Sequence, residues 1–297
     1  MIDANHNIMN WLDRPDELQA ALEFTAAETG FVPALIEKDF WCSLVLWRLF
    51  AAGDCPLVFK GGTLLSKAYV PFNRLSEDLD FTLPTDPATT RGQRGKRARA
   101  IAARLSAATD GLPLKSGEWS SFNGSTQHQI VLEYSSVFGA HGTLKLEVGQ
   151  RELPLRPIQS VSLATLLLDP LFSEAAVDPV MAFALDVTEA YAEKVRATLT
   201  RKHPAPRDLY DLHHAVETGV LNWRDEDFLK LAALKVASEP PSDWLAVTRI
   251  DAFRKGVESE LRPVLRPAAF DTFNLTMALA TMTALANALK PHLTSVP

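Results

Sequence analysis

The chain has 297 residues, of which 47% are hydrophobic and 22% are charged, and its formal net charge is −6 at pH 7. This composition supports a full hydrophobic core in one large or two modest domains. No run approaches the roughly 18 apolar residues of a membrane span, and the first 13 residues lack the basic start and apolar core of a signal peptide, so we expect a globular, soluble, cytoplasmic protein without a membrane partner.

The first half of the chain has an α+β pattern. Helices are expected over Pro15–Gly30, Val32–Ala52, Thr63–Val70 and Thr90–Thr109. Strands are expected near residues 56–59, 78–83, 114–120, 127–135 and 143–149. Helices that pack on such a sheet predict a catalytic domain over residues 1–158.

From Ser160 onward the pattern is helical. The expected helices are Ser162–Leu168, Pro179–Leu199, Pro206–Thr218, Asp225–Ser238, Ser242–Glu258 and Ala268–Leu289. We predict that residues 159–297 form a mainly helical domain that completes the active site.

The two cysteines favour no covalent or metal-binding role. Cys42 lies in an expected apolar helix, and Cys55 directly precedes an expected buried strand. We therefore expect reduced thiols that pack in the core, rather than a disulfide or a zinc site.

A Gly-Gly-Thr turn connects the strand near residues 56–59 to the helix that follows it. Glycine permits close backbone approach, and the unpaired N–H groups and dipole of the helix N-terminus attract anions, so a triphosphate would face this turn. A Gly-Gly-Thr turn by itself is also typical of an ordinary strand-to-helix connection. The candidate nucleotide-binding residues of this segment are Lys60, Gly61, Gly62, Thr63, Ser66 and Lys67.

Two carboxylates follow on the next strand. Asp78 and Asp80 alternate with apolar residues, so both face one side of the strand. Such a pair suits Mg²⁺ or Mn²⁺, and a second ion would complete a two-metal site for phosphoryl or nucleotidyl transfer, although Asp-x-Asp also occurs by chance on solvated strands. Ser76, just before them, has either a direct role at the nucleotide or the local role of a turn residue.

A third carboxylate candidate lies on the strand near residues 143–149. Lys145 and Glu147 share one face of this strand, and apolar residues occupy the other. Glu147 is either a third metal ligand or part of the solvated face of an edge strand.

The order of strand, Gly-Gly-Thr turn, helix and Asp-x-Asp strand resembles the superfamily of DNA polymerase beta-like nucleotidyltransferases. Four segments are similar to the AbiEii/AbiGii family of nucleotidyltransferase toxins, MenT-like proteins that form the toxin half of a type IV-like toxin–antitoxin system. They are Glu37–Trp41, Phe59–Phe81, Leu144–Val148, and Glu193–Lys194 with Arg207–Leu212. This resemblance implies an α+β fold with a polymerase beta-like mixed sheet flanked by helices and a helical C-terminal half.

The resemblance also implies roles for single residues. Gly61, Gly62 and Thr63 would lie at the phosphates, Asp78 and Asp80 at the metal, Lys194 against the triphosphate, and Asp208 or Asp211 at the rear of the active site. Arg207 would join Asp208 among the nucleotide contacts. Asp208 is also placed to stabilise a helix N-terminus, so Asp211 is the stronger catalytic candidate. A lone lysine such as Lys194 is otherwise a surface residue, but its flexible ammonium can neutralise phosphate charge.

Two basic clusters interrupt the overall acidic composition. Residues 91–109 contain no acid and carry Arg91, Arg94, Lys96, Arg97 and Arg99, and a second cluster contains Arg201 and Lys202. These residues are candidates to bind an RNA backbone. The alternative is an ordinary solvated helix face.

Together these features predict a toxin-like enzyme. It would transfer a nucleoside monophosphate from an NTP to an RNA acceptor, foremost the 3′ end of tRNA, and so block translation, with Mg²⁺ or Mn²⁺ as cofactor. The resemblance further implies a cognate AbiEi-like antitoxin. The alternatives are transfer of a nucleotide or phosphate to a protein hydroxyl, including that of Ser76, and a catalytically silent scaffold that binds nucleotide or antitoxin.

Overall fold

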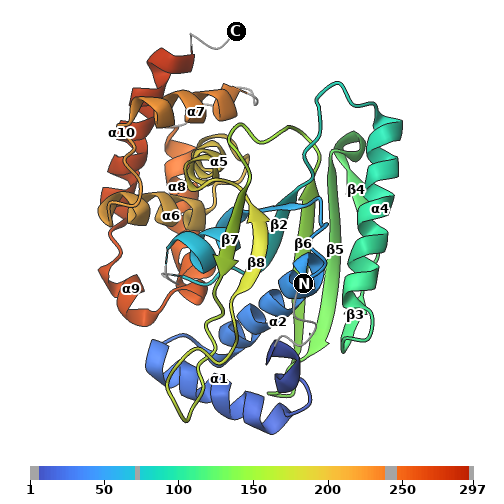
Figure 1. Cartoon of the computed structure of the whole chain (residues 1–297). Helices are drawn as coiled ribbons and strands as arrows, with labels where there is room; N and C mark the ends of the chain where they lie inside the picture. Colours follow the sequence, from blue (N-terminus) through green and yellow to red (C-terminus); the bar gives the residue numbers. More distant parts are fainter. Residues whose placement is uncertain (1–6, 71–73, 238–245, 294–297) are drawn as a thin grey trace. The chain divides into compact units, whose positions relative to one another are not determined.

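The computed structural model describes residues 7–70, 74–237 and 246–293 (Figure 1). It divides into two compact units, Met1–Leu185 and Asp186–Pro297. The division lies after residue 185 rather than after residue 158, because the segment beyond residue 158 continues the sheet of the first unit.

The first unit is built on a mixed sheet. In the described part of the chain its strands are β1 Val58–Lys60, β2 Asp78–Thr82, β3 Leu114–Ser116, β4 Ser120–Phe122, β5 Gln127–Ser135, β6 His141–Gly149, β7 Gln159–Leu163 and β8 Val180–Ala184. Their order across the sheet is β3-β5-β6-β2-β1-β8-β7, and β4 pairs with β5. The pairs β2–β6 and β1–β8 are parallel and the others are antiparallel, so the predicted mixed sheet of an α+β fold is confirmed.

Several helices of this unit begin at residues typical of a helix N-terminus. The helical segments in the described part of the unit are η1 Asn7–Trp11, α1 Pro15–Thr29, α2 Pro33–Phe50, α3 Gly61–Leu64, η2 Leu65–Tyr69, α4 Arg91–Thr109 and η3 Asn123–Ser125. Proline occupies the first turn of α1 and α2, where its missing N–H costs nothing. Thr90 and Gln93 form a capping box at the start of α4. The largely buried α2 packs against β6 and β8 and supplies much of the core.

Two predictions about residues 159–185 are wrong. In the expected helix Ser162–Leu168, residues 162 and 163 end strand β7 and residues 164–168 are not helical, and the expected helix from Pro179 begins as strand β8. In β8 the buried residues alternate with Met181 and Phe183, which are exposed although they are apolar. A strand with apolar residues on both faces lacks the polar alternation that identifies a strand.

The expected strand near residues 114–120 is also interrupted. It consists of β3 and β4, which both pair with β5. Between them the Gly117 N–H donates to the Val131 carbonyl at 2.8 Å.

The second unit is helical. Its described helices are α5 Val187–Thr200, α6 Pro206–Glu217, α7 Glu226–Ala237, α8 Val247–Gly256, η4 Val257–Leu261, η5 Arg262–Val264, α9 Pro267–Thr272 and α10 Leu275–Leu293. α5 packs against α6 and α7, and α10 packs against the same two helices. The expected helix Ala268–Leu289 is divided into α9 and α10 at Asn274, whose side chain accepts from the Met277 N–H at 3.1 Å. Residues 238 and 242–245, which we expected to be helical, lie outside the described residues.

The fold bears on the predictions for the two cysteines and for membrane-spanning helices. Both cysteines are free and buried, which confirms the predicted packing thiols, and burial raises the pKa of Cys42 to about 12. Within the described ranges, no helix combines the length and apolar character needed to cross a membrane.

Candidate active site

The Gly-Gly turn is in direct contact with the strand that carries the acid pair. Gly61 has φ +80°, and a Cβ atom there would lie 2.9 Å from the Cβ of Asp80 and collide with its carboxylate. A Cβ on Gly62 would meet the Arg74 guanidinium and would lie 2.9 Å from Ser76 Oγ. An added Cβ would therefore displace protein side chains at both positions, and the positive φ of Gly61 adds backbone strain there. The structure thus brings the predicted phosphate turn and Asp80 together.

Four charged residues lie on the adjacent strands β2 and β6, and we call them a block: Asp78, Asp80, Lys145 and Glu147. In the parallel pair of β2 and β6, Asp78 lies opposite Lys145 and Asp80 lies opposite Glu147. Asp78 and Asp80 are partly exposed, whereas Leu79, between them, is fully buried. The predicted alternation along β2 is therefore present, and Glu147 lies beside Asp80 on the neighbouring strand.

Lys145 balances part of this negative charge. Its ammonium forms an ion pair with the Glu147 carboxylate. Burial lowers the pKa of Lys145, but the hydrogen bond with Glu147 and the charges of Glu147, Asp78 and Asp80 outweigh burial and raise it. All three carboxylates therefore act on the same cation.

The donor chemistry of the acid pair fits a divalent cation. Carboxylate oxygens are the ligands that Mg²⁺ and Mn²⁺ prefer, and Mg²⁺ commonly takes only one or two of them from the protein. In the part of the chain that the structure describes, no group of three or more His, Cys, Asp or Glu side chains is arranged to hold a metal ion. That Asp78 and Asp80 hold the cation, with Glu147 as a third ligand, stays a prediction.

The hydroxyl groups after the glycines bind the protein backbone. Thr63 Oγ1 donates to the Asp78 carbonyl at 2.5 Å, which ties the turn to β2. Ser66 Oγ donates to the Thr63 carbonyl at 3.2 Å and is buried. Both residues therefore shape the turn, and their contact with a nucleotide stays a prediction. Lys60 is partly exposed and lies opposite Asp80 across the β1–β2 pair.

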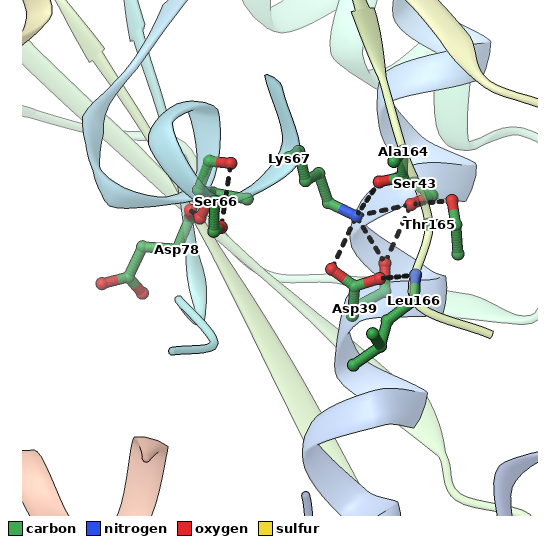
Figure 2. Close-up of polar contacts among 9 residues, drawn as sticks. Asp39, Ser43, Ser66, Lys67, Asp78, Ala164, Thr165 and Leu166 are labelled. Carbon is green, nitrogen blue, oxygen red and sulfur yellow. Dashed lines mark hydrogen bonds and ion pairs between the residues drawn. The ribbon is translucent and has the colours of Figure 1, made fainter. Parts of the chain in front are cut away.

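Lys67 does not reach the surface of this unit, so its expected place at the phosphates is corrected. Its side chain is 0% exposed, and Nζ lies 2.6 Å from Asp39 Oδ1. Figure 2 shows the ammonium pointing toward α2, whereas the Asp78 carboxylate points the other way. An ammonium enclosed by protein groups cannot also contact a phosphate in the site.

Arg74 is a site residue that the sequence pattern does not reveal. It is buried, its Nη1 donates to the Leu75 carbonyl at 3.1 Å, and its Nη2 packs on Gly62. Ser76, which is partly exposed, packs on the same glycine. The only sequence signal for Arg74 is its position just before the Ser-Glu-Asp-x-Asp block.

In the second unit the predicted residues Lys194, Asp208 and Asp211 come together. Lys194 Nζ lies 2.7 Å from Asp208 Oδ1 and 2.9 Å from Asp211 Oδ2. Arg201 Nη1 approaches Asp208 Oδ2 at 3.2 Å. Burial raises the pKa of Asp208, but the charges of Lys194 and Arg201 outweigh burial and lower it. Arg207 precedes Asp208 in the first turn of α6 and is partly buried.

The basic clusters divide into internal and exposed residues. Arg94 donates to the Thr89 and Gly124 carbonyls, and Arg97 donates to the Pro84 carbonyl at 2.6 Å. These two guanidinium groups hold the start of α4 to neighbouring loops. The exposed members of the proposed RNA-binding set are Arg91, Lys96, Arg99, Arg201 and Lys202.

Comparisons with known proteins identify a family and a similar fold. The family model described as Nucleotidyl transferase AbiEii toxin, Type IV TA system, matches residues 45–288. Among solved structures, the fold is similar to that of MenT4, nucleotidyltransferase toxin Rv2826c from Mycobacterium tuberculosis H37Rv, with a TM-score of 0.55 and 18% sequence identity. The similarity covers 94% of this chain and 90% of the MenT4 chain, and at this identity it is evidence for the fold. No curated protein sequence matches the chain.

Proposed function

Because this chain belongs to the AbiEii family of nucleotidyltransferase toxins, we propose that it transfers a nucleoside monophosphate from an NTP to the 3′ end of a tRNA and so blocks translation. The family membership makes the protein a nucleotidyltransferase of a type IV toxin–antitoxin system, with an NTP as substrate and an antitoxin as partner. The RNA acceptor, the divalent metal, the cytoplasmic location and an AbiEi-like antitoxin are parts of our proposal.

The contact between Gly61 and Asp80 is the observation that carries the proposal. It joins a backbone turn suited to phosphates to a pair of partly exposed carboxylates. Asp78 and Asp80 would hold Mg²⁺ or Mn²⁺, which when bound neutralises charge that develops on the phosphates. The N–H groups at the start of α3 would orient the triphosphate.

The proposed reaction is a substitution at the α-phosphorus. The oxygen of the RNA 3′-hydroxyl bonds to that phosphorus, and its proton passes to solvent. The bond from the α-phosphorus to the bridging oxygen of the β-phosphate breaks, and pyrophosphate leaves with the electron pair. Positioning and charge stabilisation supply most of the rate enhancement in such transfers, so the carboxylates and the turn are the residues on which the rate depends.

The exposed basic residues of α4 support an RNA acceptor. Arg91, Lys96 and Arg99 face solvent on a helix that contains no acidic residue. Clustered cations of this kind bind a phosphate backbone without regard to sequence. In the second unit, Lys194 and Asp211 remain our proposed catalytic residues, and Arg201 and Lys202 remain proposed RNA contacts.

A protein acceptor is the second candidate, and one observation favours it. Ser76 is partly exposed, and its Oγ packs on Gly62, in the turn proposed to bind phosphate. A serine hydroxyl in that place could accept the nucleotide or a phosphate in place of the RNA.

The test is to incubate the purified protein with total tRNA, Mg²⁺ and each α-³²P-labelled NTP in turn. We expect the wild type to label tRNA and Asp80→Asn to lower labelling at least ~1000-fold without a change in thermal stability. The control is Glu133→Gln, which removes an exposed carboxylate from β5, where it pairs with Lys115 at 3.1 Å. Undiminished tRNA labelling by the Asp80 variant would refute the proposed site. Label on the protein that Ser76→Ala abolishes would instead establish the second candidate.

A further inference from the structure

We propose that Lys67 is a positioning residue of the nucleotide site, because its buried ion pair with Asp39 holds the helical segment 61–69 against α2. This inference rests on the proposed function, in which the turn at the start of that segment binds the NTP phosphates. Lys67 itself touches neither substrate nor metal in this role.

The ion pair is enclosed and fully satisfied. Lys67 Nζ lies 2.6 Å from Asp39 Oδ1, and the two side chains are 0% and 4% exposed. The ammonium also donates to Ser43 Oγ at 2.8 Å and to the Ala164 carbonyl at 3.2 Å. The second oxygen of Asp39 accepts from the Leu166 N–H at 3.0 Å. Figure 2 shows these groups converging on one point.

Three segments that are distant in sequence meet at this ion pair. α2 contributes Asp39 and Ser43, η2 contributes Lys67, and the chain after β7 contributes residues 164–166. The Ala164 N–H donates back to the Lys67 carbonyl at 3.0 Å, and Thr165 Oγ1 donates to Ser43 Oγ at 2.6 Å. Displacement of Lys67 would therefore release contacts with both other segments.

Stability alone does not account for such a pair. Burying two charges costs a desolvation penalty that their attraction only partly offsets, and well-packed apolar side chains often stabilise a core as well. A buried ion pair does, however, define relative position, because leaving either charge without its partner is strongly unfavourable. This favours a role in fixing where the helical segment lies.

The segment that Lys67 holds has little regularity of its own. It begins as a short α-helical turn at Gly61 and continues as a π-turn, in which the Val70 N–H donates to the Leu65 carbonyl at 2.8 Å. π-turns are rare in helices and frequently occur at functional sites. The bond from Thr63 Oγ1 to the Asp78 carbonyl fixes the front of the segment, and Lys67 fixes its rear. Loss of the rear anchor would shift the phosphate-binding N–H groups but leave the carboxylates of β2 in place.

The test compares Lys67→Met with a destabilised control that leaves the ion pair intact. Leu49→Ala removes a fully buried side chain further along α2 and creates a cavity. Binding of the four α-³²P-labelled NTPs is measured with Mg²⁺ present, at a temperature where thermal unfolding shows that each variant is folded. We expect Lys67→Met to weaken NTP binding about tenfold and to raise KM to the same extent, with kcat within about twofold of wild type. Leu49→Ala should bind NTP as the wild type does.

A milder variant covers the case in which Lys67→Met does not fold. Ser43→Ala removes one hydrogen-bond partner of Lys67 and of Thr165, and we expect about threefold weaker NTP binding. Wild-type affinity in the folded Lys67 variant, or in Ser43→Ala if only that variant folds, would overturn the inference. If Leu49→Ala loses as much NTP affinity as Lys67→Met, the inference is also overturned, because the weaker binding would then result from general destabilisation. If the wild type binds no NTP, the proposed function itself is refuted, and the role of Lys67 in it is refuted as a consequence.

Discussion

The acidic clusters of the two units contain the same residue types but differ in burial. In the first unit Asp78 and Asp80 are partly exposed beside a glycine turn, and their charges, with that of Glu147, raise the pKa of Lys145 on the neighbouring strand. In the second unit Asp208 and Asp211 are about 5% and 7% exposed and enclose the Lys194 ammonium. Carboxylates with accessible oxygens can take a ligand, whereas carboxylates that already hold an internal cation fix the position of that cation.

This difference assigns different tasks to the two clusters. The aspartates of the first cluster are partly exposed, so we expect their substitution to affect activity more than folding. The charges of the second cluster compensate one another inside the protein, so its substitution should affect both. Asp208 and Asp211 both pair with Lys194, so we expect substitution of either to affect the position of that ammonium as well.

The largest effect on stability is expected for Lys194→Met. This change leaves Asp208 and Asp211 buried without their principal cation, which should cost about 3–5 kcal/mol in the free energy of unfolding. We also expect at least a ~100-fold loss of tRNA labelling, the order of loss for a charge that stabilises a transition state. Urea unfolding and labelling assays measure the two effects, and Lys202→Met, at an exposed neighbour, serves as the control. If Lys194→Met is as stable as the wild type, the two clusters do not differ in their contribution to folding.

Gly61→Ala should affect activity more than stability. Alanine at φ +80° is strained, and its Cβ would also displace Asp80, so we expect roughly 30-fold lower labelling and a loss of about 1–3 kcal/mol in stability. Gly30→Ala is the matched control, because Gly30 has φ +77° but nothing lies within 4 Å of an added Cβ. If both variants lose activity equally, strain rather than the contact with Asp80 is responsible.

A smaller effect is expected when the exposed charges of α4 are removed. Replacing Arg91, Lys96 and Arg99 with Gln should weaken tRNA binding several-fold at low salt and reduce its salt dependence, because fewer counterions are released. Filter binding across a salt series measures both quantities. Replacement of Arg94 and Arg97, which donate to backbone carbonyls, should instead lower thermal stability. If the salt dependence of tRNA binding is unchanged in the triple variant, the RNA does not bind these three residues.

The smallest effect concerns acid stability. The pKa of Asp208 in the folded protein lies below its ordinary value of 3.8, so its ionised form stabilises the fold above that value, and this stabilisation is lost as the pH falls through the folded pKa. We expect the stability difference between wild type and Asp208→Asn to be constant from pH 5 to 7 and to shrink below about pH 4. Urea unfolding at each pH measures it.

An exposed aspartate provides the comparison for this experiment. The hydrogen bond from Arg104 lowers the pKa of Asp54, but Asp54 is exposed, so added salt should screen its contribution. The contribution of the buried Asp208 should persist in 0.5 M salt, about three times the physiological ionic strength. Equal screening of both would mean that Asp208 is more accessible than its burial indicates.

The sequence by itself determined the features that depend on neighbouring residues. The alternation of Asp78 and Asp80, the glycine turn, the capped start of α4 and the first turn of α6 all follow from local periodicity and backbone chemistry. The family resemblance assigned Lys194 and either Asp208 or Asp211 to the active site, and the structure brings these three residues into contact.

Only the tertiary structure decided what each side chain meets. β8 is a strand because it pairs with β1 and β7, although its apolar run also suits a helix. Lys67 lies near the glycine turn in sequence, yet Asp39 on another helix draws its ammonium inward. A Cβ on Gly62 would meet Arg74 and Ser76, which precede the acid pair in the chain. Local periodicity reports the face on which a residue lies, whereas partners come from segments that only the fold brings together.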